Sequence, residues 1–238
     1  MREGPGRWSW KAPASGLRRL TIRRPAGDSI TLNAFVLVPA ARVRAGRLNG
    51  YRIGAYPSKP LKGLAIYRPP KGFVEVTPEN ENTPLSPHFT LGQFLCKQEG
   101  GYPKYIVLRT QLLLKLEYLL GLVNSEGFRA DTFTVMSGYR TPDYNRAIGN
   151  VPYSRHVYGG AADIYIDENP RDGVMDDLDG NGHVDKADAA VLYDLIAEQS
   201  SRPEYDGHEG GLGEYGSTPA HGPFVHVDVR GFSARWGK

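Results

Sequence analysis

Ser137-Gly138-Tyr139-Arg140-Thr141-Pro142 is the stretch of this 238-residue chain from which the fold and the chemistry can be worked out. Three further segments follow it: Ser154-Arg155-His156, Gly159-Gly160-Ala161-Ala162-Asp163 and, far downstream, Phe224-Val225-His226-Val227-Asp228. Together they supply two histidines and a carboxylate, which is the ligand set of a catalytic zinc with one position left for water. We therefore predict a metal site made by His156, Asp163 and His226.

The local pattern predicts how these side chains are brought together. Asp163 opens an alternating run to Asp167, which is typical of a half-buried strand. Residues 224–230 alternate as well, so that Phe224, His226 and Asp228 face one way and the valines face the other. If the two strands pair, His226 and Asp163 approach one point. The alternative is that the histidine is buried with its ring hydrogen-bonded to protein groups, and that the aspartate belongs to a turn.

The order of the motifs resembles the D-alanyl-D-alanine metallopeptidase family. The pattern is S-G-Y-R-T-P, then S-x-H-x-x-G-x-A-x-D, then a late H-x-D on a strand, and the similarity extends from about Ser86 to Lys238. That family includes zinc carboxypeptidases and murein endopeptidases, and it shares its zinc site with the lysostaphin and hedgehog-type group. The resemblance implies zinc ligands at His156, Asp163 and His226, and substrate contacts at Arg140, Ser154 and Tyr139.

The general base of the family is missing from its usual positions. Relatives often carry Glu three residues before the last histidine, or His two residues before it, and here these positions are Pro223 and Phe224. Asp228 and His221 are the two candidates for this role. Asp228 alternatively orients a ligand histidine, and His221 is alternatively a surface-loop residue.

Arg140 follows a predicted strand at residues 132–136. A guanidinium at a strand end suits bidentate capture of a carboxylate or support of a developing oxyanion. The alternative is a structural ion pair that fixes the loop.

A second metal signal lies in the run from Asp177 to Asp188, which fits an EF-hand-like calcium loop of the dockerin type. The oxygen ligands fall on Asp177, Asp179, Asn181, Asp185 and Asp188, with the carbonyl of His183 at position seven. Gly182 stands at position six, where the chain turns sharply, and a helix is expected from Ala187 to about Gln199. Such a site predicts structural Ca²⁺; the alternative is a solvated acidic loop.

Charge is distributed unevenly along the chain, although the net charge is only +3. Residues 1–75 hold 15 Lys or Arg and 3 Asp or Glu, whereas residues 160–215 hold 3 and 15. A basic part favours an anionic polymer such as cell wall, or is simply a solvated face. The aromatic-interleaved patterns of nucleic-acid modules are not evident, so we expect no nucleic-acid partner. The single cysteine, Cys96, excludes an internal disulfide and reads as a small buried side chain.

Turns rich in Gly, Pro and Asn divide the chain into four parts. These are a flexible arm (1–16), a small β domain (17–76), a linker (77–85) and a zinc peptidase domain (86–238) with an insertion at about 168–200. The fold class expected is α+β, with an antiparallel sheet in the peptidase domain. The clearest helix is predicted from about Lys104 to Val123, and Thr90 to Gln93 fits a capping box. No transmembrane segment is expected.

These features predict a zinc-dependent peptidase that hydrolyses peptidoglycan stem or cross-link peptides, as a carboxypeptidase or an endopeptidase. One alternative is a non-catalytic peptidoglycan-binding protein that keeps a structural zinc. A weaker one is a zinc hydrolase acting on a different amide. The family implies the periplasm or cell envelope, although the first residues carry no apolar signal core. The oligomeric state is not indicated.

Overall fold

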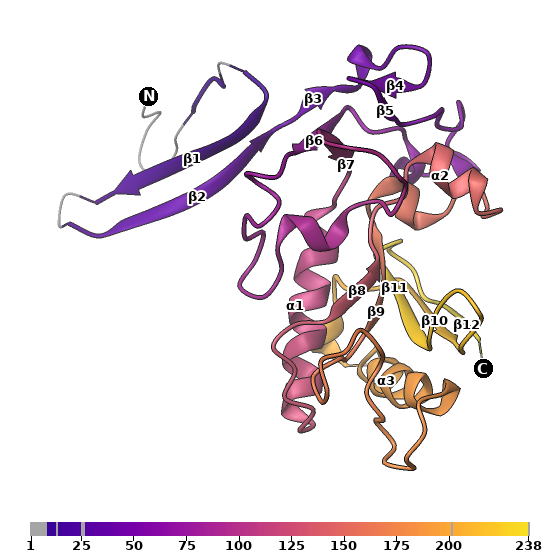
Figure 1. Ribbon diagram of the computed structural model, residues 1–238. Helices are drawn as coiled ribbons and strands as arrows, with labels where there is room; N and C mark the ends of the chain where they lie inside the picture. Colours follow the sequence, from indigo (N-terminus) through magenta and orange to yellow (C-terminus); the bar gives the residue numbers. More distant parts are fainter. Residues whose placement is uncertain (1–8, 13, 25–26, 201, 238) are drawn as a thin grey trace.

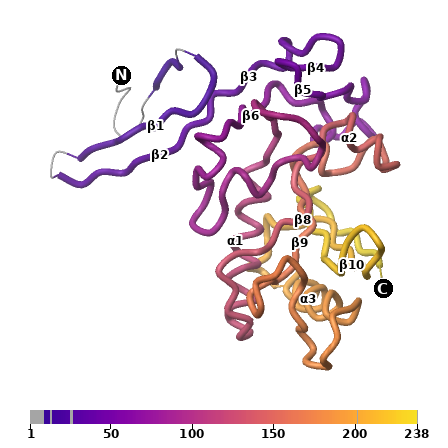
Figure 2. Tube along the Cα trace, viewed as in Figure 1, coloured from indigo at the N-terminus to yellow at the C-terminus, as the bar shows by residue number. Residues whose placement is uncertain are grey.

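The computed structural model describes residues 9–12, 14–24, 27–200 and 202–237, so the predicted arm 1–16 lies partly outside the described residues. Figure 1 shows a lower half built on a sheet and two long helices, an upper half of short strands and loops, and a β ribbon that projects from the upper half. The Cα trace in Figure 2 follows the chain from the ribbon through the upper half into the lower half, where it ends. Helices and strands are both present, which agrees with the α+β expectation.

The lower half contains a five-stranded sheet in the order β12-β10-β11-β9-β8. Its strands are β8 (Thr134–Ser137), β9 (Ala161–Tyr165), β10 (Gly211–Tyr215), β11 (Phe224–Asp228) and β12 (Ala234–Trp236). All neighbours are antiparallel except β10 and β12, which are parallel. His226 of β11 stands directly opposite Asp163 of β9, so the two strands pair, which is the condition for these side chains to approach one point.

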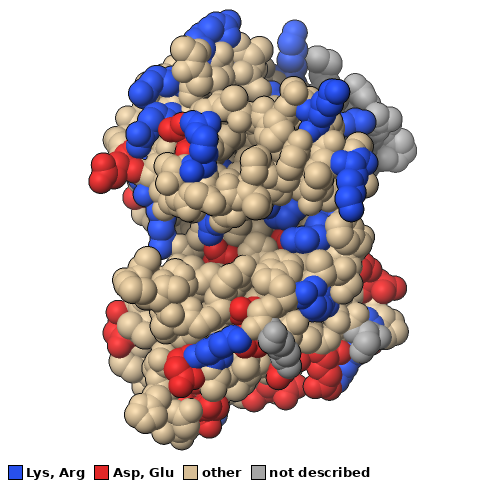
Figure 3. All heavy atoms as spheres, turned by 90° about the vertical axis from the view of Figure 1, so that its right-hand side faces the viewer, with Lys and Arg blue, Asp and Glu red and all other residues tan. Residues whose placement is uncertain are grey.

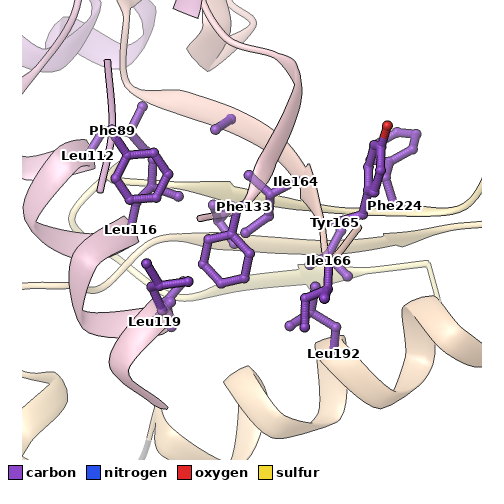
Figure 4. Packing of buried hydrophobic residues seen from close by; sticks show 14 of the residues in the cluster. Phe89, Leu112, Leu116, Leu119, Phe133, Ile164, Tyr165, Ile166, Leu192 and Phe224 are labelled. Carbon is purple, nitrogen blue, oxygen red and sulfur yellow. The ribbon is translucent and has the colours of Figure 1, made fainter. Parts of the chain in front are cut away.

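Two helices complete the core of the lower half: α1 (Thr110–Ser125) and α3 (Lys186–Gln199). In Figure 4 the leucine stripe of α1, with Leu112, Leu116 and Leu119, faces Phe133 and Ile164. These leucines are at most 1% exposed, so each contributes nearly its full transfer free energy, roughly 1.5–3 kcal/mol. Leu192 extends this core from α3 (Figure 4).

The helix predicted from Lys104 begins later than expected. Residues Lys104–Ile106 form β7, which pairs with β6 (Gly72–Val76), and α1 begins at Thr110. Tyr105 and Ile106 favour a strand by their shape, and pairing with β6 prevails over the helical spacing of the leucines. The capping box at Thr90 and Gln93 is confirmed, and it opens a short 3₁₀ helix, η4 (Leu91–Phe94).

The upper half is assembled mainly from short pieces that precede α1, together with α2. The ribbon pairs β1 (Gly16–Arg23) with β2 (Ser29–Val36), and further pairs are β4 (Arg47–Leu48) with β5 (Tyr51–Arg52), and β3 (Val38–Pro39) with β6. The remaining elements are the 3₁₀ helices η1 (Ala40–Arg42), η2 (Leu61–Gly63), η3 (Ala65–Tyr67), η5 (Arg155–Tyr158) and η6 (Pro203–Tyr205), and the short helix α2 (Pro142–Ala147). The β3-β6-β7 sheet joins residues on both sides of the predicted linker 77–85. The division into domains stays a prediction.

Residues 53–67, which we call the wall segment, pack against η5. Tyr67 makes edge-on ring contacts with Tyr153 and Tyr158, with centroids 5.8 and 5.5 Å apart. Tyr56 adds a third such contact with Tyr158, at 5.7 Å. The hydroxyl of Tyr153 donates to the carbonyl of Lys59 at 2.9 Å. The wall segment and η5 are therefore held together by rings and hydrogen bonds.

None of the helices among the described residues has the length and apolar character needed to cross a membrane.

Candidate metal centre

Three side chains from two strands and one 3₁₀ helix meet at a point that we call the His/Asp cluster: His156, Asp163 and His226. Nε2 of His156 lies 3.1 Å from Oδ1 of Asp163 and 3.1 Å from Nδ1 of His226. Nδ1 of His226 lies 2.8 Å from the same aspartate oxygen. The three atoms form a small triangle, and all three residues are buried.

The tautomer of each histidine is fixed by what lies on the far side of its ring. Nδ1 of His156 is 2.7 Å from the carbonyl oxygen of Gly138, which can only accept, so Nδ1 carries the proton. Nε2 of His226 lies 3.3 Å from Oδ2 of Asp228 and donates to it. Both rings therefore turn a lone pair toward the cluster, and the carboxylate adds a third.

The backbone of η5 places His156 through a close approach to another segment. Gly159 ends η5 in the left-handed region, with φ of 64°. A Cβ atom at Gly159 would lie 2.2 Å from the carbonyl oxygen of Val107, and the amide of Arg109 donates to the carbonyl of Gly159 at 2.9 Å. Only glycine fits this position, because the residue there must have a positive φ and because there is no room for a Cβ beside the backbone of Val107.

Charge and burial act on the cluster in opposite directions. Burial alone raises the pKa of Asp163, but the facing rings of His156 and His226 hold it well below its usual range. Burial lowers the pKa of His156. Burial also opposes a charge on His226, but the carboxylates of Asp163 and Asp228 beside its ring raise its pKa above the usual value. The cluster thus attracts positive charge to its centre.

This donor set fits zinc. Imidazole nitrogen and carboxylate oxygen are zinc ligands at about 2.0–2.1 Å, and tetrahedral ligands at that distance lie roughly 3.3 Å apart. The spacings in the cluster, 2.8 to 3.1 Å, are close to this value. The lone pairs converge and the opposite ring nitrogens are held by acceptors, as in metal sites whose histidines are oriented from behind.

Asp228 lies behind His226 and not in front of the cluster. Besides the ring of His226, its carboxylate accepts hydrogen bonds from the guanidinium of Arg230 and from the amides of Gly211 and Arg230. Burial raises the pKa of Asp228, but the bonds to His226 and Arg230 outweigh it and hold the pKa far below its usual range. The ammonium of Lys115 donates to the carbonyl oxygen of Asp228 at 2.9 Å. This network orients the ring of His226.

The cluster borders a cleft of about 1050 Å³. Figure 3 shows the molecule hollowed across its middle, between the upper and lower halves, with acidic side chains gathered on the lower half. The upper side of the lining includes Leu61 and Tyr67 of the wall segment, and the lower side includes Tyr215, Phe224 and Trp236. A cleft of this size is at the upper end of the range for drug-sized ligands, so an oligopeptide fits.

The other predicted site residues are placed in different ways. Ser154 and His221 line the cleft, and neither belongs to the His/Asp cluster. Arg140 also lines it, but its guanidinium donates to Oδ2 of Asp163 at 2.5 Å and to Oγ of Ser137 at 2.8 Å. The structure thus realises the structural ion pair that was one alternative for Arg140. Tyr139 is 1% exposed and its hydroxyl lies 2.8 Å from that of Tyr56, so it packs against the wall segment, and its contact with substrate stays a prediction.

Trp236 was not predicted as part of the site. Its ring centroid lies 5.2 Å from that of His226, and its Nε1 donates to the hydroxyl of Tyr215 at 2.8 Å. A Cβ at Gly213 would lie 2.2 Å from that Nε1, so the indole occupies the space that the glycine leaves. A glycine within a strand beside the His226 strand was the available sequence signal.

In the acidic loop from Asp177 to Asp188, carboxylates accept hydrogen bonds from backbone amides of the same loop. Asp177 accepts from the amides of Gly180 and Gly182 at 2.8 and 2.7 Å, and Asp188 accepts from Leu178 at 2.6 Å. Gly182 has φ of 86°, as the sharp turn at position six requires. Carboxylate oxygens of Asp177, Asp179 and Asp188 lie within 4.8 Å of one another, whereas Asp185 caps α3. Calcium binding by this loop stays a prediction.

Comparison with known families matches residues 87–181 to the family described as Peptidase M15. This segment contains Arg140, His156 and Asp163 and ends before His226. The match supports a peptidase of the D-alanyl-D-alanine zinc peptidase family, whose members depend on zinc. Among curated proteins, none matches the chain.

Proposed function

We propose that this protein is a zinc-dependent peptidase that hydrolyses peptide bonds in peptidoglycan stem or cross-link peptides. One observation carries the proposal: His156, Asp163 and His226 turn three lone pairs to one point at the edge of a large cleft. The Peptidase M15 match over residues 87–181 supports the reaction class independently of this geometry.

In this proposal the three cluster residues hold the metal, and the residues around them keep it in place. Zinc supplies a Lewis acid that polarises the scissile carbonyl and activates water for attack. Asp228 fixes the ring of His226, the carbonyl of Gly138 fixes that of His156, and Arg140 occupies the outer oxygen of Asp163. Because all three are held from behind, the cluster keeps its shape when a substrate enters.

The general base is proposed to be His221. Asp228 is unsuited, because it lies beyond the ring of His226 and is fully buried. His221 is half-buried in the cleft lining, and its Nδ1 lies 2.8 Å from the carbonyl of Gly222, to which it donates. Its Nε2 therefore keeps a lone pair that can accept a proton from the attacking water. The ring stands edge-on to that of Phe224, with centroids 5.0 Å apart.

A closed structural zinc site is the main rival. Such a site has a fourth protein ligand, whereas a catalytic site leaves a position for water. Among the described residues, the group that converges here has three members. This count supports the catalytic alternative over a zinc-holding wall-binding protein.

The deciding experiment is mass spectrometry of fragments released from purified peptidoglycan by zinc-loaded protein and by its His156→Ala variant. We expect cleaved stem or cross-link peptides from the unaltered protein alone, with zinc lost in the variant. Equal release by both proteins would refute the assignment of His156. Wall binding without release by either protein would favour the binding-protein alternative.

Two finer proposals accompany this function. The acidic loop from Asp177 to Asp188 binds Ca²⁺ in a structural role, pinning the insertion that carries α3 against β10 and β11. The substrate class places the protein in the periplasm or cell envelope, where peptidoglycan is found.

A further inference from the structure

The lining of the cleft is rich in cations. It contains Lys97, Arg140, Arg155 and Arg230, and among the described lining residues the one acid is Asp163. Such a lining attracts an anionic ligand, because a low-dielectric cleft strengthens the field of its charges. The question is which of these cations is available to bind it.

The three arginines already have other partners. Arg140 is bonded to Asp163 and Ser137, and Arg230 holds the carboxylate of Asp228. Arg155 is 2% exposed, donates to the carbonyl of Ile66 at 2.9 Å, and lies 4.9 Å from the ring centroid of Tyr67. Each of them is therefore a poor first choice for a ligand that enters from solvent.

Lys97 differs from them in both exposure and partners. Its side chain is exposed, and among the described residues no protein group forms a hydrogen bond or an ion pair with it. An unpaired ammonium in a cleft binds an incoming carboxylate without first giving up a protein partner.

The backbone around Lys97 is fixed beside Arg140. The amide of Tyr139 donates to the carbonyl of Phe94 at 3.0 Å, and the amide of Thr141 donates to Sγ of Cys96 at 3.5 Å. The hydroxyl of Thr141 also bonds to Oε1 of Gln98 at 3.2 Å. Since Cys96 and Gln98 both turn to Thr141, the residue between them turns away from it, and Lys97 reaches the cleft.

We propose that Lys97 binds the C-terminal carboxylate of the peptide substrate in a subsite beside Arg140. This inference rests on the proposed function and makes it narrower, because an enzyme that requires a free C-terminal carboxylate removes terminal residues. Arg140, to which the sequence pointed for this role, instead positions Asp163. The preferred substrate class is therefore a peptide with a free terminal carboxylate and not an internal cross-link.

The test uses one acylated peptide that ends in D-Ala-D-Ala and the same peptide as its C-terminal amide. Zinc-loaded wild type is compared with Lys97→Met, Lys97→Arg and the control Lys71→Met, whose exposed side chain lies outside the cleft lining. We expect wild type to prefer the acid. Lys97→Met should raise KM for the acid by about ten- to a hundredfold, the range of a hydrogen bond to a charged group, with little change in kcat. Lys97→Arg should recover part of the loss, and Lys71→Met should match wild type.

Three results would overturn the proposal: equal cleavage of acid and amide by wild type, an equal loss on both peptides in Lys97→Met, or a loss in kcat alone. Calorimetric binding of the two peptides to the same proteins separates this proposal from the proposed function. If no protein hydrolyses either peptide, the carboxypeptidase form of the proposed function fails, yet a preference for binding the acid that disappears in Lys97→Met still supports the subsite. Absence of that preference refutes the subsite in either case.

Discussion

Arg140 lies against the outer oxygen of Asp163, and the inner oxygen of the same carboxylate faces His156 and His226. The guanidinium is 2.5 Å from Oδ2, while Oδ1 lies 3.1 Å from His156 Nε2 and 2.8 Å from His226 Nδ1. The two oxygens are thus assigned to different partners, and the carboxylate can offer only one of them to a metal ion. Arg140 thereby determines which oxygen of Asp163 would face a bound metal ion.

Replacing Arg140 by Met should weaken zinc binding by about 10- to 100-fold, the usual cost of losing a group that orients a metal ligand. The released oxygen of Asp163 would rotate, and its negative charge would be left uncompensated in a buried site. Competition against a zinc-binding dye measures the affinity. Unchanged affinity together with lost hydrolysis would instead assign Arg140 to the substrate.

Exchanging Asp228 for Asn should also lower zinc affinity by about 10- to 100-fold. The amide can present its NH₂ group to Nε2 of His226, which favours the tautomer whose proton points into the cluster. The measurement is zinc affinity beside kcat. His221→Gln is the contrasting variant, since it should lower kcat and leave zinc affinity intact. If Asp228→Asn kept its zinc and lost only kcat, Asp228 would be the base.

Lys115 should make the folded state more stable as the pH rises above neutrality. Burial lowers its pKa to about 7, which is below that of an unfolded lysine at roughly 10.4. Between these values the unfolded chain binds more protons, so the free energy of unfolding increases with pH. The penalty below pH 7 is on the order of 4 kcal/mol.

Denaturant unfolding of wild type and Lys115→Met at pH 7 and pH 10 tests this directly. The variant lacks the penalty, so its stability relative to wild type should be greatest at pH 7 and should fall by pH 10. The hydrogen bond to the carbonyl of Asp228 is lost at both pH values and cancels in the comparison. A difference that does not change with pH would mean that Lys115 keeps an ordinary pKa.

Calcium should raise the melting temperature of the zinc-loaded protein, because a ligand that binds only the folded state stabilises it. The change to test is Asp177→Asn combined with Asp179→Asn, which removes two of the converging carboxylates. Calorimetry with and without Ca²⁺ should show a shift for wild type and for the control Asp206→Asn, and none for the double variant. Absence of any shift in wild type would reduce the loop to a solvated acidic turn.

Gly159→Ala should destabilise the protein by about 2 kcal/mol or more. A Cβ at residue 159 would lie 2.2 Å from the carbonyl oxygen of Val107, so the backbone of one segment would have to move. The alanine would also have to adopt a positive φ. Gly149→Ala is the matched control, because its φ is 73° but no atom lies within 4 Å of the added Cβ. The control should cost about 1 kcal/mol. If urea unfolding gave equal losses of stability for the two variants, strain from the positive φ alone would explain both losses.

The cluster was predictable because period-two alternation fixes which side chains share a face of a strand. His226 and Asp163 come from short alternating runs, and their pairing follows once the strands are neighbours. The position that η5 gives to His156 is harder to predict from sequence, because it depends on the close approach of Gly159 to Val107.

The roles of Arg140 and Lys97 could not be separated from sequence. Lys97 lies far upstream of the Arg140 motif in the sequence, and only the fold brings the two together. Only the contact of Arg140 with Asp163 shows that Arg140 already has a partner. The start of α1 was mispredicted for a similar reason, because the pairing of Lys104–Ile106 with β6 joins residues about thirty positions apart. Helical spacing carries no information about such a distant partner.

The carbonyl of Ile66 receives hydrogen bonds from both Arg109 and Arg155, each at 2.9 Å. One backbone atom of the wall segment therefore ties the residue before α1 to the helical turn that carries His156. A change that moves this carbonyl would therefore shift both the turn that places His156 and the lining of the cleft. In the proposed enzyme, wall-segment substitutions that displace this atom would alter metal affinity and peptide preference together.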